Sequence, residues 1–161
     1  MTLESVFFVT QIVAAIAVIA SLFYVSREVR HNTKALKLAT YQSVVDSSME
    51  ILHSLYGSNE TATFYHRCLY NNAELDGPEK LRWHAVMITL YRHWDNLLYQ
   101  NKKGSLETEM WLSYDRTMTH YLANQPWVDW FVANGYLFST NLQQLLGDKI
   151  KDIESKKIIN Q

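Results

Sequence analysis

A long apolar run near the N-terminus dominates the hydropathy pattern of the chain. From Ser5 to Val25 the sequence contains no charged residue. A helix rises about 1.5 Å per residue, so a run of this length spans about 30 Å, the thickness of the hydrocarbon core of a bilayer. A helix at the surface of a soluble protein needs a polar face, which this run lacks. The pattern predicts a transmembrane anchor over residues 1–26.

The charges on either side of the run predict its orientation. Glu4 precedes it without any lysine or arginine. Basic residues follow it at Arg27, Arg30, Lys34 and Lys37. Positive charge stays on the cytoplasmic side, so we expect the N-terminus outside and the rest of the chain in the cytoplasm. We expect the inner membrane interface at Tyr24, Arg27, Arg30 and Lys34.

A cleaved signal peptide is the alternative to an anchor. Small residues at Ala17 and Ala20 resemble a cleavage site. A signal peptide also needs a basic N-terminal region and a shorter apolar core, and residues 1–4 contain no basic side chain. We therefore favour the uncleaved anchor.

Beyond the anchor, apolar residues recur at helical spacing and turn-forming residues are scarce. The chain has 5 glycines and 2 prolines, which favours long helices. The first helix is expected to run on to Tyr56 and to end at Gly57. The further helices are expected over residues 60–70, 78–102, 105–124, 127–134 and 140–158. Pro78 suits the first turn of its helix, whereas Pro126 is expected to break the chain.

The predicted fold class is all-α, with one N-terminal transmembrane helix that continues into a small cytoplasmic helical bundle. We expect a juxtamembrane helix over residues 27–57 and the helical domain over residues 58–161. On the juxtamembrane helix, spacings of four and three alternate. They pass through Val25, Val29, Asn32, Leu36, Ala39 and Ser43. This is a weak coiled-coil seam, with small and polar members.

Inside the anchor, small side chains four residues apart predict a surface on which helices approach closely. Gln11 is the strongly polar side chain of the run, and its amide needs a hydrogen-bond partner in hydrocarbon. The residues expected at a helix-association or pore-facing surface are Thr10, Gln11, Ala14, Ala17 and Ser21. The alternative is that Gln11 reaches the outer headgroups and has no protein partner.

Composition narrows the function classes. The formal net charge of −1 offers no excess that would attract nucleic acid, which we do not expect as a partner. The single cysteine, Cys68, cannot form an internal disulfide, and it is more typical of a core side chain than of a nucleophile activated by Arg67. The Glu-x-x-His pattern of Glu50 and His53 has no second copy. We expect no metal, no cofactor and no enzymatic activity.

The third expected helix carries the polar residues that most resemble a site. Its apolar arc is interrupted by His84 and Asp95, and a buried carboxylate must be paired or hydrogen-bonded. Arg92 and Tyr99 lie within helical reach of Asp95. We expect a polar network of His84, Arg92, Asp95 and Tyr99. It either fixes helix packing, which we favour, or contributes with His93 to a small ligand site.

Aromatic residues gather in the last third of the chain. Trp127, Trp130 and Phe131 share one helical face, and a core role is the default for such a group. Contact with the membrane surface or with a partner is the alternative. The other members of this group are Trp111, Tyr114, Tyr121, Tyr136 and Phe138.

Three motifs in a fixed order carry a resemblance. They are Asn-Thr-Lys-Ala-Leu at 32–36 with Tyr-Gln-Ser at 41–43, Pro-Glu-Lys-Leu-Arg at 78–82, and Arg92, Asp95, Tyr99 and Gln100 followed by Gly104 and Trp111. The chain resembles an uncharacterised bacterial family of single-span, membrane-anchored helical proteins, a domain of unknown function. Asp95 stands where this family leads us to expect Glu. The resemblance implies this architecture, in the bacterial inner membrane, and no reaction.

Together these patterns predict a membrane-anchored, homo-oligomeric, non-catalytic scaffold or sensor. The expected partners are the lipid bilayer and further copies of the chain, with another membrane protein as an alternative partner. Two other functions remain open. One is a channel-forming oligomer whose N-terminal helices line a pore, and the other is a membrane-tethered ligand-binding or enzymatic helical domain.

Overall fold

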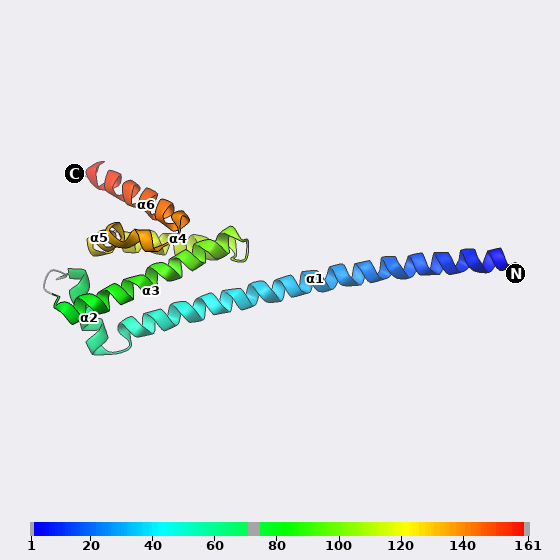
Figure 1. The fold of residues 1–161 in the computed structure, drawn as a ribbon, viewed down its shortest axis with the longest axis horizontal. Helices are drawn as coiled ribbons and strands as arrows, with labels where there is room; N and C mark the ends of the chain where they lie inside the picture. The colour runs from blue at the N-terminus through cyan, green and yellow to red at the C-terminus, as the bar shows by residue number, and fades with distance from the viewer. Residues whose placement is uncertain (1, 71–74, 160–161) are drawn as a thin grey trace. The chain divides into compact units, whose positions relative to one another are not determined.

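The computed structural model describes residues 2–70 and 75–159 (Figure 1). The helices are α1 (Leu3–Tyr56), α2 (Asn59–Tyr70), α3 (Gly77–Lys102), α4 (Thr108–Leu122), α5 (Gln125–Asn134) and α6 (Thr140–Ile159), with the short 3₁₀ helix η2 (Gly135–Leu137) after α5. Within the described ranges there is no strand, so the predicted all-α class is confirmed. The chain divides into two compact units, Met1–Ala39 and Thr40–Gln161.

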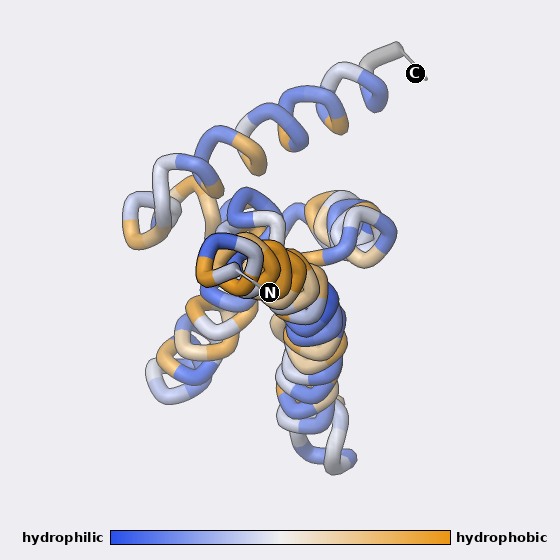
Figure 2. Tube along the Cα trace, turned by 90° about the vertical axis from the view of Figure 1, so that its right-hand side faces the viewer, coloured by the Kyte–Doolittle hydropathy of each residue, from blue (hydrophilic) through white to orange (hydrophobic). Residues whose placement is uncertain are grey.

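The first unit consists of the N-terminal part of α1. Its side chains are exposed from position 2 to position 39, including the whole apolar run. Figure 2 shows this part of the helix as strongly hydrophobic near the N-terminus. Among the described helices, α1 alone is both long enough and apolar enough to cross a membrane. The prediction of one helix that meets the requirements of a membrane span is confirmed at this level.

The second unit contains the last turns of α1 together with α2 to α6. Val44 and Leu55 of α1 are buried, and Ile51 packs against the same core. The segment from Thr40 to Tyr56 therefore contributes to the core of the second unit, which begins at Thr40, whereas the sequence pattern placed the start of the helical domain at residue 58.

Two helix starts follow from side chains that bind free backbone N–H groups. Asp76 accepts a hydrogen bond from the N–H of Glu79 at 2.8 Å, and the Glu79 carboxylate accepts one from the N–H of Asp76 at 3.2 Å, which completes a capping box. Pro78 occupies the first turn of α3, as predicted. Ser58 caps α2, because its Oγ accepts a hydrogen bond from the N–H of Thr61 at 3.1 Å.

The break predicted at Pro126 is wrong. Helix α4 ends at Leu122, two residues earlier than expected, and α5 begins at Gln125, so Pro126 lies in the first turn of α5. Residues of a first turn have no helical acceptor for their N–H, so proline loses nothing there and its fixed φ suits the helix. The chain turns instead at Ala123 and Asn124.

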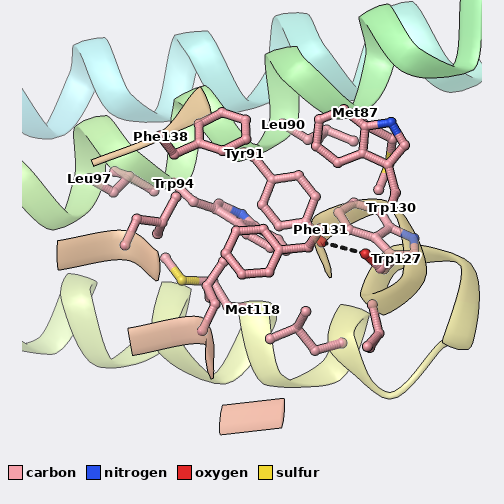
Figure 3. Packing of buried hydrophobic residues seen from close by; sticks show 14 of the residues in the cluster. Met87, Leu90, Tyr91, Trp94, Leu97, Met118, Trp127, Trp130, Phe131 and Phe138 are labelled. Atoms are coloured by element: carbon pink, nitrogen blue, oxygen red, sulfur yellow. Dashed lines mark hydrogen bonds between the residues drawn. The ribbon is translucent and has the colours of Figure 1, made fainter. Parts of the chain in front are cut away.

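Tyr91 of α3 lies at the centre of an aromatic core (Figure 3). Its ring stacks on Trp130 and on Phe131, at centroid distances of 5.4 and 5.1 Å, and its hydroxyl donates to the carbonyl of Trp127 at 2.8 Å. The core role expected for the Trp127, Trp130 and Phe131 face is confirmed, because all three side chains are buried. Tyr136, by contrast, is 75% exposed.

Candidate functional site

Some polar side chains of the apolar run form hydrogen bonds within α1, and Gln11 does not. Thr10 Oγ1 donates to the carbonyl of Val6, and Ser21 Oγ donates to the carbonyl of Ala17, both at 2.8 Å. Neither hydroxyl therefore needs a partner from outside the helix. The Gln11 amide, in contrast, makes no hydrogen bond to any residue in 2–70 or 75–159. Ala14 and Ala17 are exposed, like the rest of the expected association surface.

The expected interface residues follow the apolar run directly on α1. Tyr24 and the three basic residues after it, Arg27, Arg30 and Lys34, are exposed. None of these basic residues forms an ion pair within the described part of the chain. Their charges are thus available to water or to anionic headgroups.

Asp95 connects α3 to the start of α6. Its carboxylate accepts hydrogen bonds from the Ser139 N–H at 3.1 Å and from the Ser139 hydroxyl at 2.5 Å. Ser139 Oγ in turn accepts a hydrogen bond from the N–H of Leu142, so Ser139 is the N-cap of α6. Arg92 lies 3.8 Å from the same carboxylate and donates to the carbonyl of Leu137 at 3.2 Å. This part of the predicted network joins helices.

Tyr99 lies near this group without a hydrogen bond to it. Tyr99 is exposed and, together with Arg92 and Asp95, lines a surface pocket of about 310 Å³. Lys102, at the same pocket, donates to the side-chain oxygen of Asn141 at 2.5 Å. The polar groups of the pocket are therefore largely engaged with one another.

His84 lies apart from the other three members of the predicted network. Its Nδ1 accepts a hydrogen bond from Trp130 Nε1 at 3.2 Å, and the two rings are 5.2 Å apart. His84 does not line the pocket of Arg92 and Asp95. The alternative prediction of a small site built from Asp95, His84 and His93 is wrong, because each of these side chains contacts a different part of the fold.

His93 belongs to a partly buried polar contact between three helices that the sequence did not predict. Ser48 Oγ on α1 lies 3.1 Å from His93 Nε2 on α3 and 2.6 Å from the Tyr114 hydroxyl on α4. Burial lowers the pKa of His93. The available signal was the spacing of Val44, Ser48, Ile51 and Leu55, which places Ser48 on the core-facing side of α1.

A second contact missed from the sequence joins α4 to α6. Lys149 Nζ lies 2.8 Å from the Asp115 carboxylate and 2.9 Å from Thr119 Oγ1. The three side chains are partly buried, so this pair is less screened by solvent than an ion pair on an open surface. No sequence pattern identified it, because its two helices are distant in the chain.

Cys68 is fully buried, as the core interpretation predicted. Burial raises the pKa of its thiol to about 11, above its ordinary value, so the reactive thiolate is scarce near neutral pH. Glu50 and His53 form the Glu-x-x-His pattern that the sequence offered as a candidate metal motif. Within the part of the chain that the structure describes, no group of three or more potential ligands gathers in one place.

Comparison of the chain with protein-family models, with curated proteins and with solved structures found no match.

Proposed function

We propose that this protein is a single-span membrane protein whose helical unit, Thr40–Gln161, is held at the cytoplasmic face of the bacterial inner membrane. The N-terminus lies outside. The protein acts as a non-catalytic scaffold or sensor and assembles with further copies of itself.

The observation that carries this proposal is the exposure of the whole apolar run. Burial of an apolar side chain is favourable by about 1.5–3 kcal/mol relative to exposure to water. The run from Ser5 to Val25 carries large apolar side chains on every side, and not one of them is buried by the chain itself. A bilayer supplies the missing apolar surroundings, and the basic residues from Arg27 onward favour the stated orientation.

A non-catalytic role is supported by the hydrogen bonds of the polar side chains in the second unit, which connect its helices. Asp95 holds the N-cap of α6 through Ser139, and Ser48 joins His93 to Tyr114. His84 receives the indole N–H of Trp130. These contacts connect helices, and they favour a role in which the unit presents a defined surface.

Membrane fractionation of the full chain tests the proposal. We expect the protein to stay in the membrane pellet after alkaline carbonate extraction and to leave it in detergent. The intact mass should match the full sequence, because the anchor is not cleaved. Release by carbonate, or a mass that lacks the first 17–20 residues, would contradict the anchor and support a signal peptide instead.

A further inference from the structure

The seam that starts at Val25 extends into the apolar run. Counting back from Val25 with the same alternation of three and four passes through Leu22, Val18 and Ala15 and reaches Gln11. Counting forward passes through Val29, Asn32, Leu36 and Ala39. We call this stripe, from Gln11 to Ala39, the α1 seam. All of its side chains are exposed.

The two amides of the seam, Gln11 and Asn32, are 21 residues apart, which is three repeats of seven. A repeat of seven on a helix with 3.6 residues per turn drifts by about 20° per repeat. The stripe stays in contact with a neighbour only if two helices wind around each other. The seam therefore has the period of a helix that pairs with another helix.

The lysine and arginine residues of the same segment lie away from the seam, whereas Glu28 lies beside it. Arg27, Arg30, Lys34 and Lys37 follow one another at spacings of three, four and three, so they form a stripe of their own. At about 100° per residue, this stripe lies on the opposite side of α1 from Val29 and Leu36. Two identical helices can thus meet at the seam while their cations point outward into water.

These observations favour a second copy of the chain over other occupants. A membrane orients all copies alike, so two α1 helices meet in parallel and each seam residue faces its own equivalent. An amide both donates and accepts hydrogen bonds, so Gln11 can satisfy Gln11 of a second copy, and Asn32 can do the same. Ala15 on the seam and Ala14 beside it are small, which allows a close approach.

We propose that α1 pairs in parallel with α1 of a second copy through the α1 seam, from Gln11 in the membrane to Ala39 beyond it. This inference rests on the proposed membrane location. It also specifies the self-association that the proposed function includes, by naming the contact face and its two polar positions.

Disulfide cross-linking of the full chain in native membranes tests the pairing. Leu36→Cys lies on the seam, and its matched control, Lys34→Cys, lies on the basic stripe two residues earlier. A second pair, Val29→Cys and Lys37→Cys, repeats the comparison. The parent chain serves as a blank because Cys68 is fully buried. After mild oxidation, we expect several-fold more covalent dimer from each seam variant than from its control.

Further variants and outcomes distinguish a failure of the proposed pairing from a failure of the proposed membrane location. Asn32→Lys, added to Leu36→Cys, should lower the yield of dimer, because two cations would face each other. Equal yields from seam and control positions, or no dimer from the seam variants, would overturn the pairing even if the protein stays in the membrane pellet. A protein found in the soluble fraction would overturn both the pairing and the proposed membrane location.

Discussion

His93 is a titratable side chain that the fold places between three helices. It contacts Ser48 of α1 and Tyr114 of α4 from its position on α3, and no carboxylate within the described residues forms an ion pair with it. A hydroxyl and a phenol provide no negative charge near neutral pH. Partial burial disfavours the charged imidazolium, so the pKa of His93 lies below the ordinary value of 6.5.

The sign of the pH dependence follows from this shift. Below about pH 6.5 the unfolded chain binds a proton at His93 that the folded chain does not, so stability is complete above that pH and falls as the pH drops toward the folded pKa. In His93→Gln this loss should be absent. We expect the free energy of unfolding of the parent chain to fall relative to the variant between about pH 7.5 and 5.5. A constant difference across this range would contradict the assignment.

Urea unfolding in mild detergent, followed by tryptophan fluorescence, provides the measurement. All five tryptophans of the sequence lie between positions 83 and 130, so the signal reports on the second unit alone. The apolar run of α1 contributes no tryptophan.

Which polar side chains need hydrogen bonds was predictable from the sequence, but most of their partners were not. Asp95 was expected to need a hydrogen-bond partner. Helical spacing pointed to Arg92 and Tyr99, which lie on the same helix. The principal partner, Ser139, is 44 residues away, and no local spacing predicts such a contact. Cys68 and the Trp127 face were predicted correctly, because burial follows from residue type and helical period.

Among the elements, the connection between α1 and α2 depends on a glycine. A Cβ atom at Gly57 would lie 2.4 Å from the carbonyl oxygen of His53, far inside normal contact distance. At Gly147, in α6, a Cβ would meet nothing within 4 Å. The two glycines therefore provide a matched pair of substitutions in the same unit.

Gly57→Ala should lower the free energy of unfolding of the second unit by about 1–3 kcal/mol, the usual cost of forcing extra bulk into a filled space. Gly147→Ala should raise it by up to about 1 kcal/mol, because alanine is the better helix former. Tryptophan fluorescence during urea unfolding measures both. Equal effects of the two substitutions would show that contact with His53 is not the reason for glycine at position 57.

Element boundaries were predictable where a side chain binds the free end of a helix. The start of α3 is marked by Asp76 and Glu79, which cap it, and the start of α2 is marked by Ser58. In each case the capping contact lies within four consecutive residues. Pro126 misled the prediction because proline both breaks a helix interior and suits a first turn, and local sequence does not say which applies. In the fold, Pro126 lies in the first turn of α5, and Trp127 and Trp130 after it are buried.

For the whole molecule, hydropathy and charge predicted the long apolar helix directly, because these patterns depend on composition along one element. The packing of Thr40–Tyr56 with α3 and α4 was not predicted, because it depends on contacts such as Ser48 with His93. The proposed function requires that α1 crosses a membrane, with its N-terminus outside and the helical unit inside.

Labelling of single cysteines with a membrane-impermeant maleimide, in intact spheroplasts of cells that express the full chain, tests this claim most directly. Thr2→Cys precedes the apolar run, and Ser155→Cys lies on an exposed part of α6. We predict labelling of Thr2→Cys in intact spheroplasts and of Ser155→Cys only after the membrane is permeabilised. Labelling of Ser155→Cys before permeabilisation, or protection of Thr2→Cys, would contradict the account.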